Sequence, residues 1–274
     1  MESPLSHFRP SLFVATSLVL ALSTALPLAH AEGRQSPIDI HTSATVGAPL
    51  PKITRAYQTA EVSVVNTFNP GANPFVPEEF ATLRVNVPAG SSISVNGVTY
   101  DLAQFHFHTP SEHKVNGKAA PMEIHFVHVK RGACLGDNDA LLVIGALVKA
   151  GGEHHELQKI FKHALPEDSN AAPLTIPAFH LDRVLPHGTH SWRYDGSLTA
   201  PSAVGCNNPA GSVADQLNTD VFPENVSWVL LEEPVIMSTS QIRHFRALYE
   251  AAGNSRAVQP LNGRTVYRDQ ATHH

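Results

Sequence analysis

The segment QFHFHTPSEHKVNGKAAPMEIHFVH, residues 104–128, holds five histidines and two glutamates. Three of the histidines, His106, His108 and His125, take alternating positions in apolar runs that predict β-strands. Side chains alternate between the two faces of a strand, so His106 and His108 share a face. If the two strands pair in the correct register, the three imidazoles converge. Three neutral imidazoles that leave one coordination position open are the ligand set of a catalytic Zn²⁺.

Two polar residues in phase with these histidines strengthen the prediction. Gln104 and Glu123 each lie two residues before a candidate ligand, where they could hydrogen-bond the ring nitrogen that does not face the metal. A structural zinc is disfavoured because the chain has no CxxC, and the absence of HExxH excludes the commonest zinc proteases. The alternative is that the alternating histidines belong to strands without a metal.

The elements that must position these residues are mostly strands. Phe105 and Phe107 would face a core behind the sheet, as would Ile124 and Phe126. Asn-Gly within VNGV, residues 95–98, predicts a tight hairpin. Further strands are predicted at 60–68, 82–89, 140–149 and 227–237, and helices at 152–165 and 238–252. A β-dominated single domain results.

Bulk composition limits the classes of partner. The chain has 274 residues, is 42% hydrophobic and carries a formal net charge of -5, with only 16% charged residues. This length and hydrophobic content can form one sizeable core. Because there is no surplus of basic residues to hold phosphate groups, we expect no nucleic-acid partner. The sequence does not indicate an oligomeric state.

Residues 1–31 predict a secretory signal peptide. An apolar run ends at Ala29-His30-Ala31, which offers small residues to a signal peptidase. An uncleaved membrane anchor is the alternative. Cleavage would leave a domain of residues 32–274 in the periplasm or outside the cell, with no membrane attachment. In such an oxidising compartment Cys134 and Cys206, the only cysteines, could form one disulfide, although two unpaired thiols remain the alternative.

Several motifs resemble those of one enzyme family. QFHFHTPSEH, MEIHFVH, QSPIDI, GSLTAP, VSWVLLEEPV and VQPLNGR are similar, in the same order, to signature segments of the α-class carbonic anhydrases, especially the bacterial, exported ones. The similarity extends from Gln35 to Tyr267. It implies a predominantly β, single-domain fold: a large, twisted, mostly antiparallel sheet of about ten strands with a few short peripheral helices.

The resemblance also implies residue roles. His106, His108 and His125 match the zinc ligands, and Asn254 stands where the family supplies a backbone carbonyl to the second ligand. Thr199 matches the catalytic hydroxyl, and Glu112 matches the carboxylate that accepts its hydrogen bond. His113, Tyr194 and Arg256 match a buried polar network beside the zinc site of the family. Gln104 and Glu123 match the residues that hydrogen-bond the first and third zinc ligands. The substrate pocket matches Val127, Val143, Leu198 and Trp228, with Ala200 where the family has a second threonine.

The activity implied is reversible, zinc-dependent hydration of carbon dioxide to bicarbonate and a proton through a zinc-bound hydroxide. A non-catalytic binding module with the same fold is the alternative. Relatives of that kind lose zinc-ligand histidines, so the presence of all three here, with Thr199 and Glu112, favours the enzyme. One departure concerns proton transfer. Asn69 stands where the family has a proton-relaying histidine, and an asparagine side chain does not titrate.

Overall fold

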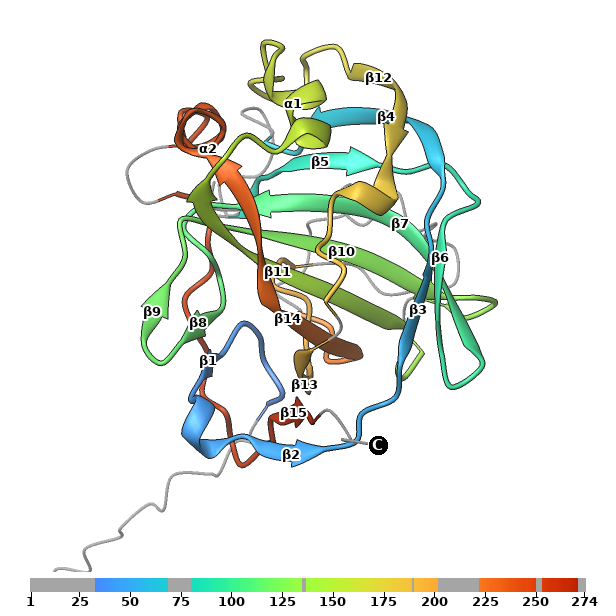
Figure 1. Cartoon of the computed structure of the whole chain (residues 1–274), viewed down its shortest axis with the longest axis vertical. Helices are drawn as coiled ribbons and strands as arrows, with labels where there is room; N and C mark the ends of the chain where they lie inside the picture. Colours follow the sequence, from blue (N-terminus) through green and yellow to red (C-terminus); the bar gives the residue numbers. More distant parts are fainter. Residues whose placement is uncertain are drawn as a thin grey trace, which may run out of the picture. The chain divides into compact units, whose positions relative to one another are not determined.

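Strands predominate in the computed structural model, which describes residues 33–68, 80–134, 137–188, 190–201, 222–249 and 253–270 (Figure 1). The strands are β1 (Asp39–Ile40), β2 (Val46–Ala48), β3 (Ile53–Ala56), β4 (Thr59–Asn66), β5 (Leu83–Asn86), β6 (Ser92–Val95), β7 (Val98–His108), β8 (Lys114–Val115), β9 (Lys118–Ala119), β10 (Met122–Lys130), β11 (Leu141–Gly151), β12 (Leu174–His180), β13 (Ser191–Gly196), β14 (Val226–Ser238) and β15 (Tyr267–Asp269). The helices are α1 (His155–Phe161) and α2 (Thr239–Arg246), with 3-10 turns at Thr42–Ala44 and Leu181–Arg183.

One twelve-stranded sheet carries most of these strands. Its order is β12-β4-β5-β7-β10-β11-β14-β13-β15-β2, and β6 pairs with both β7 and β3. Neighbouring strands are antiparallel except for β11 with β14 and β15 with β2. Strands β1, β8 and β9 form a separate small sheet. The predicted large, mostly antiparallel sheet in a single domain is therefore confirmed, with twelve strands.

The local signals read from the sequence explain several elements. Asn96 and Gly97 both have positive φ, 50° and 79°, as a tight hairpin between β6 and β7 requires. Helix α2 begins with a capping box, because Ser238 Oγ accepts from the Gln241 backbone amide while the Gln241 side chain accepts from the Ser238 amide. The Gln241 side chain also donates to the carbonyl of His154. This bond ties α2 to the start of α1, and the two helices lie side by side in Figure 1.

Proline within strand β14 has a structural explanation. A central strand is hydrogen-bonded to a neighbouring strand on each side, and a proline has no backbone N–H to donate to either. Pro234 lies beyond the part of β14 that pairs with β13, which ends at Leu231. It also lies within the register shift against β11, between the Leu231 and Val235 pairings. The strand can therefore include this proline without losing a pair of sheet hydrogen bonds.

Apolar side chains cover both faces of the central strands. On one face, Phe105 and Phe126 stack with their ring centroids 4.8 Å apart, in a core that also receives the inner sides of α1 and α2. On the other face, a second cluster contains Val127, Val143 and Trp228. The strand alternation therefore places polar residues of β7 and β10 beside this second cluster. Within the described ranges, no helix has the length and apolar character needed to cross a bilayer.

Candidate metal centre

Three histidines meet on the face of the sheet that carries the second cluster. Strands β7 and β10 pair antiparallel, with His125 directly opposite His106 and Glu123 opposite His108. The potential ligand atoms of the three histidines all lie within 4.8 Å of one another. The predicted strand alternation and the convergence of the three imidazoles are thus present in the structure, and these side chains could hold a metal ion.

Each of the three rings is held through one of its nitrogens. His106 Nδ1 lies 2.8 Å from Gln104 Oε1, His108 Nδ1 lies 2.9 Å from the Asn254 carbonyl oxygen, and His125 Nε2 lies 2.9 Å from Glu123 Oε1. A partner on one ring nitrogen fixes the orientation of the ring and leaves the other nitrogen for a metal. Gln104 and Glu123, predicted from their spacing, and the Asn254 carbonyl, implied by the resemblance, each lie within hydrogen-bonding distance of one of the three histidines.

Local backbone geometry explains how Asn254 reaches its histidine. Gly253 has a φ of 76°, which favours glycine, and a Cβ there would overlap the carbonyl oxygen of Thr109. The Asn254 side chain accepts from the Thr109 amide at 2.8 Å and donates to the carbonyls of Ala81 and Phe107. The carbonyl that orients His108 is therefore rigidly placed.

The protonation states of two of the three histidines suit metal binding. Burial lowers the pKa of His106 and of His108, so both imidazoles are neutral as metal ligands must be. Burial also opposes charge on His125, but attraction to Glu123 outweighs it and raises the pKa. His108 Nε2 is buried without a hydrogen-bond partner. Because a buried unpaired nitrogen is costly, a metal ion would supply the partner that this atom lacks.

Glu123 joins the metal centre to a buried polar chain. Burial would raise the pKa of this carboxyl, but the charges of His113 and His125 outweigh burial and lower it well below the ordinary value. Its carboxylate accepts from the His113 backbone amide at 2.8 Å, and its Oε1 lies 2.7 Å from His113 Nδ1. His113 Nε2 lies 2.6 Å from the Tyr194 hydroxyl, which donates to Ser36 Oγ at 3.0 Å. These mutual bonds identify a positioning network rather than a second metal site.

Glu112 is buried beside the three histidines. Its Oε1 accepts from the Arg256 backbone amide at 3.0 Å, while its Oε2 lies 3.8 Å from His125 Nδ1 and has no hydrogen-bond partner. The hydrogen bond from Thr199 that the resemblance implies is not present between these two described residues, although Thr199 is buried. The guanidinium of Arg256 donates to Gln35 Oε1 and to the Ser36 carbonyl, and so adjoins the polar chain at Ser36.

Four of the five predicted pocket residues form one apolar group. Val127 pairs directly with Val143 across β10 and β11, and both belong to the cluster that contains Trp228. Leu198 packs against that cluster. Trp228 also contacts the ring of His125 with a centroid distance of 4.8 Å, so the apolar surface adjoins the metal centre. Ala200 is half-buried and does not belong to that cluster.

Two residues that contribute to the metal centre and its polar network were not predicted from the sequence. Arg84 on β5 is directly opposite His106, is buried, and adds its positive charge to the effects that lower the pKa of that histidine. The alternation of Leu83, Arg84 and Val85 was the available signal, because it places the arginine on the face opposite the two apolar residues. Ser36, whose hydroxyl also accepts from the Ser197 amide, gave no comparable signal.

Two predicted features lie partly or wholly outside the described residues. Asn69, at the position of the proton-relaying histidine, is one of them. Cys134 is disulfide-bonded, and the only other cysteine of the chain, Cys206, is also outside the described residues.

A family model for the eukaryotic-type carbonic anhydrases matches residues 24–207. The chain belongs to the carbonic anhydrase family. The carbonic anhydrase of Neisseria gonorrhoeae is 33% identical over 247 residues, which cover 89% of this chain and 81% of that protein. The carbonic anhydrase of Pectobacterium atrosepticum is 29% identical, with coverages of 89% and 84%.

Solved carbonic anhydrase structures are similar as well. The α-carbonic anhydrase of Thermovibrio ammonificans, in complex with the inhibitor sulfanilamide, is 33% identical, with a TM-score of 0.66 and coverages of 85% of this chain and 86% of that one. The Photobacterium profundum α-carbonic anhydrase is 28% identical, with a TM-score of 0.66 and coverages of 86% and 90%. The resemblance to the α-class is confirmed. The family match begins at residue 24, so the boundary after Ala31 stays a prediction.

Proposed function

We propose that this carbonic anhydrase reversibly hydrates carbon dioxide to bicarbonate and a proton, with Zn²⁺ held by His106, His108 and His125. The observation that carries the proposal is the convergence of these three imidazoles, each oriented through its other nitrogen. Three histidines with an open position suit catalytic zinc. When bound, zinc supplies a Lewis acid that lets water ionise near neutral pH, as is established for carbonic anhydrases.

The remaining residues would bind and orient the reactants. Val127, Val143 and Trp228 offer an apolar surface beside His125, which suits an uncharged substrate and disfavours retention of a hydrated bicarbonate ion. We propose that the Thr199 hydroxyl donates to Glu112 Oε2, the buried oxygen that has no hydrogen-bond partner. With its own proton held there, the Thr199 oxygen can only accept from the reacting water, which would fix that water's orientation.

Proton export is proposed to depend on buffer. Asn69 cannot relay a proton, so a diffusible base would have to collect it at the mouth of the site. Raising the concentration of imidazole buffer at constant pH and ionic strength should therefore raise turnover. A turnover independent of buffer concentration would show that another group relays the proton.

Stopped-flow measurement of CO2 hydration, with zinc quantified in the same sample, tests the proposal. We expect one zinc per chain and rapid hydration. The variant His125→Ala should lose zinc and activity, whereas the exposed His155→Ala should keep both. Stoichiometric zinc without hydration would favour the second candidate, a non-catalytic binding module. A His125→Ala protein with full zinc and full rate would refute the ligand assignment.

We also propose that the mature protein is periplasmic or secreted. The apolar run and small-residue site within residues 1–31 support export, and a disulfide-bonded Cys134 suits an oxidising compartment. Amino-terminal sequencing of protein recovered from the periplasm or medium should begin at Glu32. Recovery of the intact amino terminus in a membrane fraction would favour the uncleaved anchor.

A further inference from the structure

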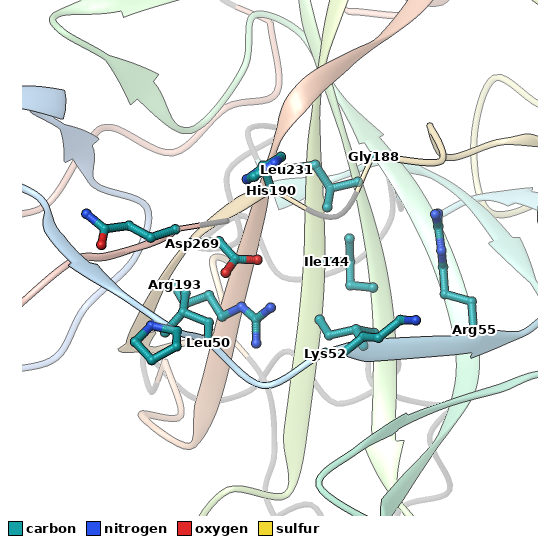
Figure 2. Close-up of a pocket in the computed structure, with 12 residues that line it drawn as sticks. Leu50, Lys52, Arg55, Ile144, Gly188, His190, Arg193, Leu231 and Asp269 are labelled. Atoms are coloured by element: carbon teal, nitrogen blue, oxygen red, sulfur yellow. The ribbon is translucent and has the colours of Figure 1, made fainter. Parts of the chain in front are cut away.

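A pocket lies on the face of the sheet opposite the metal centre. Its volume is about 330 Å³, and Ile144 and Leu231 are among its lining residues (Figure 2). These two side chains belong to the larger core, whereas their neighbours Val143 and Leu230 belong to the cluster beside the metal centre. Because adjacent residues of a strand face opposite sides of the sheet, the sheet itself separates the pocket from the metal centre.

Two half-buried arginines are fixed at the wall of this pocket by backbone carbonyls. Arg55 Nη2 donates to the Pro186 carbonyl at 2.7 Å, and Arg193 Nη1 donates to the Pro51 carbonyl at 2.7 Å. Figure 2 shows the two arginines on opposite sides of the pocket, with Ile144 between them. A guanidinium has five N–H donors, so each arginine retains donors after these bonds. Each cation is therefore held at the pocket wall with N–H donors left for a ligand.

The charges of the pocket do not neutralise one another by direct contact. Asp269 is the one acidic side chain in the lining, and its charge raises the pKa of Arg193, against the larger lowering effect of burial. No ion pair within 4.0 Å joins these two described residues. The half-buried groups, two arginines and one aspartate, thus carry a net charge of about +1, and the exposed Lys52 adds a further positive charge at the rim.

The exposed carboxylate of Glu233 offsets the exposed Lys52, so the net charge around the pocket remains about +1. His190 is exposed at the rim. Glu233, on β14, is also exposed, and its carboxylate accepts from the backbone amide of Gly188 at 3.0 Å.

We propose that this pocket binds a small organic monocarboxylate, with the carboxylate between Arg55 and Arg193 and the apolar body on Ile144 and Leu231. Arginine matches a carboxylate through paired N–H donors, and the apolar floor favours a hydrocarbon body over an inorganic anion. Asp269 disfavours a second negative charge on the ligand. The pocket is separate from the metal centre, and its ligand takes no part in CO2 hydration.

Benzoate is the probe for the test, and NMR of protein with labelled isoleucine methyl groups is the measurement. Ile53 and Ile144 line the pocket, so their methyl signals report binding there rather than at the metal centre. The zinc-loaded protein should be saturated with sulfanilamide, so that benzoate cannot occupy the metal. Benzoate should shift both signals in a saturable way, and the neutral benzamide should bind at least about tenfold more weakly. Unmoved signals, or equal binding of benzamide, would overturn the proposal.

Variants separate the charge effect from a general structural one. Arg193→Gln should weaken benzoate at least about tenfold, because it removes a charged donor. Asp269→Asn should strengthen benzoate about two- to fivefold by removing a like charge, a gain that damage to the fold would not produce. Arg243→Gln on α2, which removes an exposed charge outside the lining, should change nothing. An Asp269→Asn protein that binds benzoate no more tightly than wild type would refute the electrostatic argument.

Discussion

A buried histidine in the large core should make the stability of this protein fall steeply in mild acid. His128 is fully buried, with its Nδ1 donating to the Leu142 carbonyl at 3.1 Å and its Nε2 accepting from the Tyr57 hydroxyl at 2.8 Å. Burial lowers its pKa from 6.5 to about 4, against smaller opposing effects of backbone hydrogen bonds. The folded protein therefore keeps this ring neutral under conditions in which the unfolded chain binds a proton.

The pKa difference sets the size of the effect. Stability is unaffected above pH 6.5, and it falls as the pH decreases towards 4, because only the unfolded chain takes up the proton in that range. At about 1.4 kcal/mol per pH unit, the full difference is worth about 3 kcal/mol, of which about 2 kcal/mol is lost by pH 5. This loss is a large fraction of a typical folding free energy.

Urea unfolding of metal-free protein at pH 7.5 and pH 5 measures the effect without interference from zinc release. Wild type should lose about 2 kcal/mol more between the two conditions than His128→Gln, whatever the stability of that variant at pH 7.5. His155→Gln, which removes an exposed histidine, should lose as much as wild type. Equal losses in wild type and His128→Gln would refute the reasoning.

Three further substitutions test the packing described above. In Gly145→Ala, the new Cβ would lie 2.8 Å from Leu230 Cδ1 and 3.0 Å from Glu123 Oε1. Zinc affinity should therefore fall about tenfold and the free energy of unfolding by about 1–3 kcal/mol. A wild-type zinc affinity in chelator competition would contradict this. Phe105→Ala should cost about 3–5 kcal/mol in urea unfolding, since its fully buried ring leaves a cavity, and a cost below 1 kcal/mol would contradict the packing. Cys134→Ser should lower the unfolding free energy by about 2–5 kcal/mol under oxidising conditions and leave it unchanged in reductant.

The strands at the metal centre were predictable because their signal is local. Alternation of phenylalanine and histidine in β7, and of apolar and polar residues in β10, fixes which side chains share a face whatever the rest of the chain does. The pairing of His125 with His106 was not derivable in the same way. It depends on the path of the chain between the two strands, which includes β8 and β9, each only two residues long.

Strand β12 was missed for a physical reason. Its sequence, LTIPAFH, contains Pro177, which argues against a central strand. The structure places β12 at the edge of the sheet, and its register against β4 shifts between Ile176 and Phe179, where Ala178 has a φ of 50°. An edge position with a bulge accommodates the proline, but only the assembled sheet determines which strand lies at its edge.

Contacts between distant segments were also beyond local patterns. Arg55, Arg193 and Asp269 come from β3, β13 and β15 and line one pocket only because the sheet brings those strands together. Whether Thr199 reaches Glu112 likewise depends on the path of the backbone at residue 199, which local patterns do not determine. The family resemblance supplied the roles of these two residues but not their positions.

The late position of Asn254 in the chain bears on how this protein matures. A ribosome-bound chain that ends before residue 254 already contains all three histidines, yet lacks the carbonyl, 146 residues beyond His108, that orients the second ring. It also lacks all or part of β14 until residue 238 has emerged, although that strand lies between β11 and β13 in the finished sheet. Non-local pairing of this kind is slow. The sheet and the orientation of His108 can therefore be completed only when almost the whole chain has been synthesised.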